Sequence, residues 1–165
     1  MTPDASTRWL TADQRLAWLD MVRVLTMLPA TLDAQLERDA GLKFFEYHVL
    51  SMLSEVQDRT LRMSRLAQLT SASLSRLSNV VKRLEADGLL RRETDPDDRR
   101  ATRAVLTDAG MAAVERAAPG HVARVRDLIV DVLDPVQFDQ LHTAHQRILN
   151  RLDPTATTRP EWVDP

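Results

Sequence analysis

The sequence predicts a mainly α-helical fold that includes one small β-hairpin. Leu, Ala, Arg and Asp are the commonest residues and only four of the 165 residues are glycine, which favours helices. Apolar residues recur at three- and four-residue steps over most of the chain, as on one face of a helix. Residues 89–106 instead resemble two short strands around the turn-forming run DPDDRR.

The composition is that of a single globular domain, 1–165. Hydrophobic residues make up 44% and charged residues 28% of the chain. Cysteine is absent, which excludes disulfides, thiolate nucleophiles and cysteine metal sites. The N-terminus has no basic start followed by an apolar run, and no apolar run reaches membrane-spanning length. We therefore expect a soluble, cytoplasmic protein with no membrane partner.

The first predicted helix covers residues 13–38, where apolar residues share one face. Pro29 lies in its second half and should kink or break it, because proline removes a backbone hydrogen bond. Gly41 marks a break after this segment, and a second helix is predicted at 44–53.

A helix, a tight turn and a second helix are predicted next. After a polar loop at 54–60, a short helix at 62–69 begins where Ser64 can cap the first turn. A longer helix at 73–87 ends next to Gly88, a residue suited to a left-handed cap. Its predicted apolar stripe consists of Leu74, Leu77, Val80, Val81 and Leu84.

Strands at 89–94 and 101–106 form the predicted hairpin, or wing, with the charged run 95–100 at its tip.

The last third of the chain is predicted to be helical. A long helix covers 107–133, and Pro119 and Gly120 should bend or interrupt it. An Asp-Pro pair then starts a final helix that ends at about residue 152. The tail, 153–165, contains three prolines and is expected to be extended.

The charge is unevenly distributed along the chain, and a local basic patch is what phosphate binding needs, although charge alone favours an ordinary solvated surface. Residues 62–103 contain ten Lys and Arg against six Asp and Glu, a net charge of +4, although the whole chain has a net charge of −2. A short helix followed by a helix with a polar, basic face is the helix-turn-helix arrangement, and its second helix fits the major groove of DNA. The predicted DNA contacts are Ser73, Ser75, Arg76, Ser78, Asn79, Lys82 and Arg83 on this recognition helix, and Asp98, Arg99 and Arg100 at the wing.

The recognition helix alone could equally be an ordinary solvated helix face. The wing favours DNA, because two arginines at the tip of a turn are poorly explained by folding. An arginine projected from a wing can enter a narrow minor groove, where the negative potential is strongest. Asp98 lies two residues before Arg100 and can orient it or pair with it.

The segment LRMSRLAQLTSASLSRLSNVVKRLEADGLLRRETDPDDRRATRAVLTDAG, residues 61–110, resembles the MarR family of winged-helix regulators. The family's Asp-x-Arg pattern falls on Asp98 and Arg100 of the wing. Its Leu-Glu-x-x-Gly-Leu exit from the recognition helix falls on Leu84, Glu85, Gly88 and Leu89. Where family members often have Thr-Arg on the recognition helix, this chain has Ser78 and Asn79, so we expect a different operator sequence.

The resemblance implies a winged helix-turn-helix lobe, 44–106, and a homodimer built from helices at 13–38 and 107–152. The apolar residues in these terminal helices exceed what one two-layer domain could bury. Two-fold symmetry then predicts a palindromic operator with half-sites about 10 bp apart. The expected function is a sequence-specific transcriptional repressor that a small-molecule effector releases from double-stranded DNA.

Family members often hold an effector between the dimer helices and the DNA-binding lobe. The candidates that the resemblance suggests here are Trp18, Met21, Phe44, Tyr47, His48 and Arg116. Each has an alternative interpretation, since aromatic and histidine side chains at helical spacing are more often core or interface residues. His142 and His145 lie three apart but have no matching acidic partner, so no metal or other cofactor is expected.

Two further classes of function remain as alternatives. The chain could be a DNA-binding architectural or interaction protein without an effector, which insensitivity to small molecules would reveal. It has no glycine-rich phosphate loop, nucleophile elbow or histidine–carboxylate metal motif, so we expect that it is not an enzyme.

Overall fold

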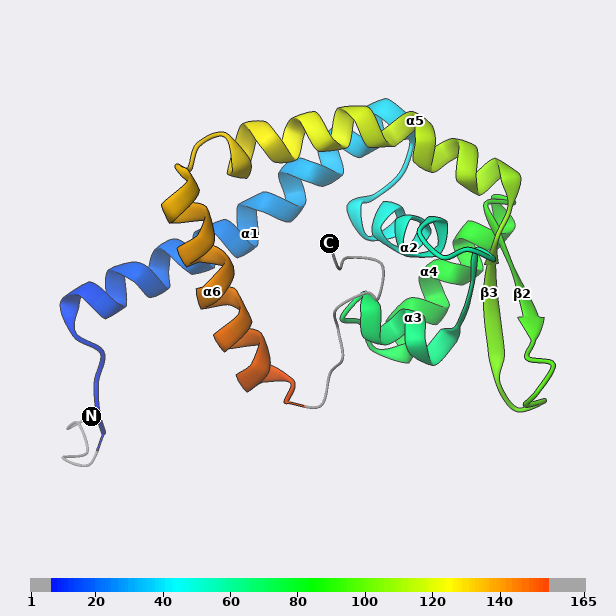
Figure 1. Ribbon diagram of the computed structural model, residues 1–165, viewed down its shortest axis with the longest axis horizontal. Coiled ribbons are helices and arrows are strands. Elements are labelled where there is room, and N and C mark those ends of the chain that lie inside the picture. Colours follow the sequence, from blue (N-terminus) through cyan, green and yellow to red (C-terminus); the bar gives the residue numbers. More distant parts are fainter. Residues whose placement is uncertain (1–6, 155–165) are drawn as a thin grey trace.

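The computed structural model describes residues 7–154, and over this range it confirms a mainly helical fold with a small antiparallel sheet (Figure 1). The elements are α1 (Ala12–Ala40), α2 (Phe44–Ser54), β1 (Thr60–Arg62), α3 (Met63–Leu69), α4 (Leu74–Ala86), β2 (Leu90–Thr94), β3 (Thr102–Leu106), α5 (Asp108–Val125), the π-helical turn η1 (Arg126–Val130) and α6 (Pro135–Leu152). The expected tail, 153–165, lies outside the described residues except for its first two positions. Within 7–154, no helix is both long and apolar enough to cross a membrane.

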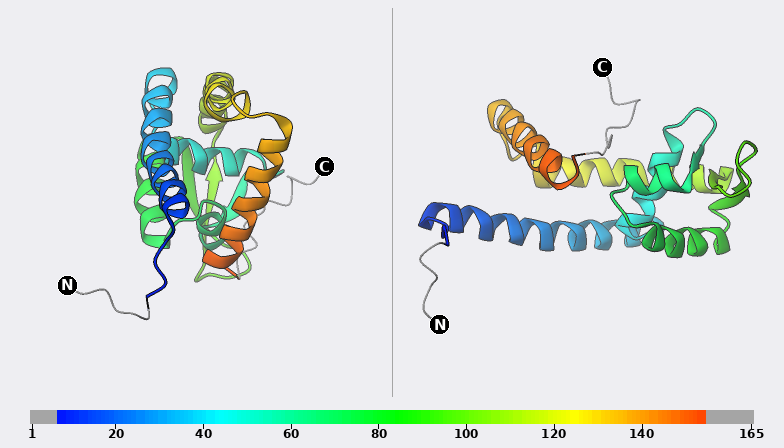
Figure 2. Two further views of the ribbon diagram at one scale, coloured as in Figure 1. Left: turned by 90° about the vertical axis from the view of Figure 1, so that its left-hand side faces the viewer. Right: turned by 90° about the horizontal axis from the view of Figure 1, so that it is seen from below.

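The chain forms a lobe and a projecting arm. Helices α2, α3 and α4 pack with the sheet into the lobe, while α1 and α5 run side by side away from it (Figures 1 and 2). The core lies in the lobe and at its junction with the arm. Its largest fully buried side chains are Leu36, Val49, Leu50, Leu53, Leu66, Leu77, Val81, Leu84 and Leu90.

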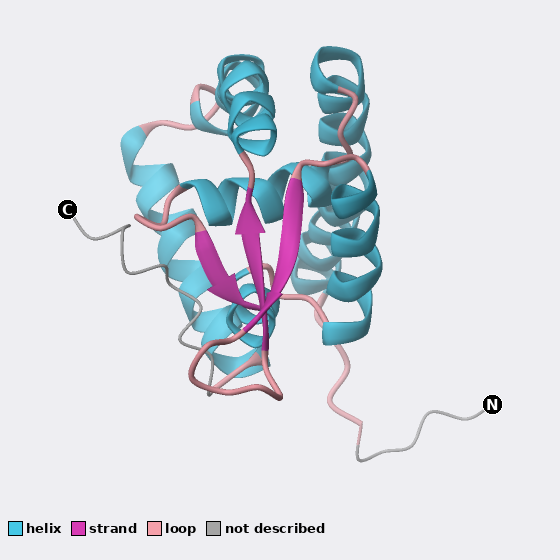
Figure 3. Cartoon of the chain, turned by 90° about the vertical axis from the view of Figure 1, so that its right-hand side faces the viewer, coloured by secondary structure: helices cyan, strands magenta, loops and turns pink. Residues whose placement is uncertain are grey.

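The sheet has three strands in the order β1-β3-β2, one more than the sequence predicted. Thr60 pairs with Val105 and Leu90 pairs with Leu106, both in antiparallel register. Figure 3 shows the three strands side by side, with helices behind them. A three-residue strand is too short to show an alternating pattern, so only its pairing with β3 identifies it.

Several predicted helix ends are confirmed. The Ser73 hydroxyl accepts the Arg76 N–H at 3.2 Å at the start of α4. Gly88 adopts the left-handed conformation, with φ of 73°, directly after α4. Ser64 does not cap α3, because Arg62 occupies the N-cap and no side chain caps this helix.

Neither Pro29 nor Pro119 interrupts its helix, contrary to the break that the sequence allowed. Both prolines lie on exposed positions, where water can solvate the carbonyl group that loses its partner. The irregularity in the last third of the chain is instead η1, which follows α5 and precedes the capped start of α6.

Leu74 is the one member of the predicted apolar stripe of α4 that is largely exposed, at 56%, whereas Leu77, Val81 and Leu84 are fully buried. It is the first residue of α4, where the helix has only begun to pack against α3. The helical spacing therefore predicted the buried stripe correctly, except that its first residue, Leu74, is exposed.

Candidate nucleic-acid interface

Helix α4 presents the polar face that the sequence predicted. Its buried stripe packs into the lobe, so the opposite side faces solvent. All seven predicted contacts of this segment are exposed: Ser73, Ser75, Arg76, Ser78, Asn79, Lys82 and Arg83. The tip of the hairpin points to the side of the lobe on which α3 and α4 lie (Figures 1 and 3).

Two of these side chains already have partners on α2. The Arg76 guanidinium lies over the Phe45 ring, 4.2 Å from its centroid, a cation–π contact. Arg83 forms an ion pair with Glu46, a buried residue that is only 5% exposed. Helix α2 therefore holds the orientation of α4, and Arg83 stabilises the lobe besides carrying surface charge.

Asn79 and Lys82 make no side-chain hydrogen bond or ion pair with the rest of residues 7–154. An asparagine side chain can pair with the N6 and N7 edge of adenine, and a lysine can reach bases or phosphates. Ser78 likewise makes no side-chain hydrogen bond within residues 7–154, so these three are the predicted contacts of α4 that are most available to a partner.

The wing is held by Asp95, a residue that the sequence placed only in the turn. Asp95 is 2% exposed, and its carboxylate accepts both the Nε–H and an Nη–H of Arg62, at 2.8 and 3.0 Å. The same carboxylate accepts the backbone N–H groups of Asp97 and Asp98, at 3.0 and 3.1 Å. Because Arg62 immediately precedes α3, this ion pair connects the wing tip to the helix-turn-helix.

Asp98 orients the backbone of the wing rather than the side chain of Arg100. Its carboxylate accepts the Arg100 N–H at 3.0 Å, and its carbonyl accepts the Ala101 N–H at 2.8 Å. The side chains of Arg99 and Arg100 are exposed. The wing thus presents two guanidinium groups from a backbone that is fixed by Asp95 and Asp98.

A further ion pair joins β2 to the end of α4. Glu85 accepts the backbone N–H of Arg92 at 2.9 Å and also its Nε–H at 2.8 Å. These hydrogen bonds from Arg92 lower the pKa of Glu85. The glutamate in the Leu-Glu-x-x-Gly-Leu pattern therefore fixes the strand that follows the recognition helix.

A groove of about 410 Å³ separates α3 and α4 from the wing. Its walls carry hydroxyl and guanidinium groups, the chemistry that binds phosphate oxygens. The lining residues are Met63, Ser64, Leu74, Ser78, Arg92, Arg100, Ala101 and Thr102.

We expect Asp95→Asn to lower DNA affinity about tenfold, because an amide cannot hold the Arg62 guanidinium as a charged carboxylate does. Arg62 lowers the pKa of Asp95 below its usual range, so the anchor is complete above about pH 4 and is lost only as the pH falls further. Affinity of the wild type should consequently show no Asp95 titration between pH 6 and 8. Gel-shift titration at fixed salt measures both effects.

Asp97→Asn, at an exposed neighbouring position, is the matched control for Asp95→Asn. An equal loss of affinity in both variants would contradict the proposal that Asp95 anchors the wing.

The predicted effector residues do not come together within one chain. Trp18 is 53% exposed, Met21 is half-buried, and both lie on the projecting part of α1. Arg116 is exposed on α5. Phe44, Tyr47 and His48 do form a cluster on α2, where it faces α5.

His121 on α5 completes this cluster, and the sequence did not single it out. Its ring lies 4.6 Å from that of Tyr47 and 6.0 Å from that of Phe44, between centroids. Phe44 also stacks with His48 at 6.2 Å. The Nδ1 atom of His121 is buried and makes no hydrogen bond to the described part of the chain. No short-range pattern could have found His121, because its partners lie on another helix.

We expect the free energy of unfolding to decrease as the pH falls from 7.5 to 5.5. Burial lowers the pKa of His48, the proximity of His121 lowers it further, and burial lowers the pKa of His121. The unfolded chain therefore binds protons at about pH 6.5, where the folded chain does not, and acid favours unfolding. Thermal unfolding over this range should show a shallower slope for His48→Gln/His121→Gln than for wild type. A wild-type midpoint that is flat with pH would contradict the assignment.

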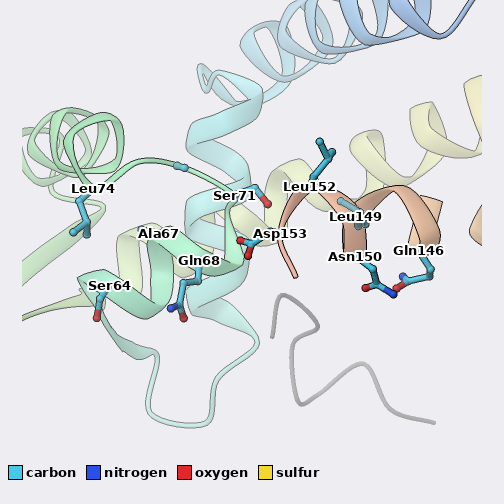
Figure 4. Close-up of a pocket in the computed structure, with 11 residues that line it drawn as sticks. Ser64, Ala67, Gln68, Ser71, Leu74, Gln146, Leu149, Asn150, Leu152 and Asp153 are labelled. Atoms are coloured by element: carbon cyan, nitrogen blue, oxygen red, sulfur yellow. The ribbon is translucent and has the colours of Figure 1, made fainter. Parts of the chain in front are cut away.

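A second groove, of about 570 Å³, lies between α3 and the end of α6. Figure 4 shows Ser64, Gln68 and Leu74 at one side of it and Leu149 and Leu152 at the other. None of the predicted effector residues lines this groove.

A recognition helix with an exposed polar face, followed by a wing that is fixed to the helix-turn-helix, defines a winged helix-turn-helix protein. The model of the MarR family matches residues 40–101, which cover the lobe up to the wing tip. A MarR family transcriptional regulator of known structure is also 41% identical to this chain over 92% of its length. The chain therefore belongs to the MarR family of transcriptional regulators.

Solved structures of MarR family transcriptional regulators resemble most of the chain. Sco3205 from Streptomyces coelicolor, in complex with DNA, is 41% identical over 92% of this chain and 95% of its own, with a TM-score of 0.88. AbsC from the same organism is 38% identical over 90% and 100%, with a TM-score of 0.85. The S. aureus MepR–DNA complex shares the fold, with 22% identity over 82% and 97% and a TM-score of 0.73. None of the curated protein sequences compared with the chain is significantly similar to it.

Proposed function

We propose that the protein is a homodimeric, sequence-specific DNA-binding repressor that a small molecule releases from a palindromic operator. One observation supports DNA binding above all: α4 has an exposed polar face, and the wing beside α4 has arginine side chains that face solvent. In this proposal α4 enters the major groove and Arg100 enters the adjacent minor groove. The groove between them accommodates the sugar-phosphate strand that separates the two DNA grooves.

The relatives support this mode of binding. Sco3205 and MepR are both described in complex with DNA, and Sco3205 aligns with nearly the entire chain. The contacts that we propose for this chain are the ten residues of α4 and the wing that the sequence singled out, with Asn79 reading bases and Arg100 the minor groove.

The apolar surface of the arm supports a dimer. A monomer rarely exposes this many large apolar side chains. Those exposed on α1 are Leu16, Trp18, Leu19, Val22, Val24, Leu25 and Met27, and those on α6 are Val136, Phe138, Ile148, Leu149 and Leu152. Helices α1, α5 and α6 are therefore the proposed dimerisation region, and a second copy is the proposed partner.

The cluster of Phe44, Tyr47, His48 and His121 supports an effector site near the junction of lobe and arm. In this proposal Trp18 and Met21 join the site only when a partner subunit brings its arm into place. Aromatic rings beside the buried, unpaired Nδ1 atom of His121 suit a small aromatic or otherwise apolar ligand with one hydrogen-bonding group.

Selection of bound fragments from genomic DNA, followed by gel-shift titration with the full chain, tests the proposal. A palindromic site with half-sites about 10 bp apart, bound by a species of twice the monomer mass in sedimentation equilibrium, is expected. A screen of small molecules against this complex then distinguishes a repressor from an architectural DNA-binding protein, which no effector would release. Equal binding to all sequences at every salt concentration would refute sequence-specific regulation.

A further inference from the structure

Leu74 is the only large aliphatic side chain on the exposed side of α4 among the described residues. Single exposed leucines are common on protein surfaces, so exposure alone assigns no role. Its position is informative, because it occupies the first turn of the recognition helix, directly after the N-cap residue Ser73. The first turn is the part of such a helix that approaches base edges most closely.

The surroundings of Leu74 suit nucleic acid better than an apolar protein surface. Residues four apart share a helix face, so Leu74 lies beside Ser78. Both line the groove between α4 and the wing, together with Ser64 and Arg100. A phosphate strand in this groove would place bases next to the Leu74 side chain.

Helix α6 of the same chain does not cover Leu74. Leu74 also borders the groove between α3 and α6, but Figure 4 shows it at the opposite end from Leu149 and Leu152. Because Leu74 remains 56% exposed with α6 in place, its apolar surface is free to meet another molecule.

The major groove offers one apolar group to such a side chain, the C5-methyl group of thymine. We propose that Leu74 is a specificity-determining residue that packs against the methyl group of one thymine in each half-site. This inference rests on the proposed function, because it requires α4 to lie in the major groove. It adds a base preference that the hydroxyl and amide groups of Ser75, Ser78 and Asn79 cannot provide.

The test replaces thymine by deoxyuridine, which lacks only the C5-methyl group, at one position of one half-site at a time. The probe is the tightest-binding duplex selected from a random library, and affinity is measured at fixed salt. Deoxyuridine at one thymine position should lower wild-type affinity about fourfold, the equivalent of about 0.8 kcal/mol for one methyl group. Leu74→Ala should bind the thymine and deoxyuridine duplexes equally at that position.

Two further variants separate the methyl contact from general effects. Leu74→Met keeps an apolar side chain and should retain the deoxyuridine penalty, whereas Ser78→Ala should weaken binding to both duplexes by the same factor. Thermal unfolding checks that each variant is folded, which the exposure of residues 74 and 78 favours. An unchanged deoxyuridine penalty in Leu74→Ala, or no thymine position that is sensitive in the wild type, would overturn this inference alone. Failure of the wild type to select any duplex would instead overturn the proposed function.

Discussion

Replacing Arg100 with alanine is expected to lower affinity for the selected operator about 10- to 100-fold, because a hydrogen bond to a charged group is worth about 1.5–3 kcal/mol. The side chain is exposed at the wing tip, and its backbone N–H is held by Asp98. The variant therefore removes a cation without loosening the turn. An arginine in a narrow minor groove meets a stronger negative potential than one on an open phosphate surface, so the loss should exceed that of an ordinary phosphate contact.

Gel-shift titration of wild type and Arg100→Ala at the same salt concentration measures this effect. Arg147→Ala is the matched control, since it removes the same charge from an exposed position on α6. Sedimentation equilibrium should give the same oligomeric state for all three proteins. Equal affinities of wild type and Arg100→Ala would exclude the wing from the interface.

Gly110→Ala is expected to destabilise the folded protein by about 2–3 kcal/mol, the cost of overpacking a closely packed site. A Cβ atom at Gly110 would lie 2.0 Å from the Leu89 carbonyl oxygen and 2.6 Å from Cδ1 of Leu106. The leucine side chain can move, but the Leu89 backbone cannot, because its carbonyl also accepts the Thr107 N–H at 3.2 Å. The third residue of α5 must therefore be glycine for this helix to begin against the exit from α4.

Gly120→Ala is the matched control for this variant. A Cβ atom there would lie 2.7 Å from Oδ2 of Asp39 and 3.2 Å from Nε2 of Gln35, the flexible ends of two hydrogen-bonded side chains that can shift together. Alanine also favours a helix interior over glycine by about 1 kcal/mol, so we expect little net change. Urea unfolding of the three proteins gives the comparison. Equal stabilities for Gly110→Ala and wild type would show that α5 can shift relative to the wing.

Much of the fold could be predicted because its signals are local. The start of α4 at Ser73, the left-handed Gly88 and the Asp-Pro start of α6 each depend on interactions within three or four residues. The same local patterns located the recognition helix and the wing, and the motif within them identified the family. The helical spacing also located the main part of the core.

The sequence by itself thus determined the order of helices, the wing and the exposed polar face of α4, since each follows from the conformational preferences of consecutive residues. Only the tertiary structure decided which distant residues meet. Several contacts join segments that are separate in the chain. They are the ion pairs of Arg62 with Asp95 and of Arg83 with Glu46, the pairing of the third strand, and the contact of the His121 ring with Tyr47. Such contacts depend on how the helices pack, because packing sets which side chains lie within hydrogen-bond distance and which, like Leu74, remain exposed.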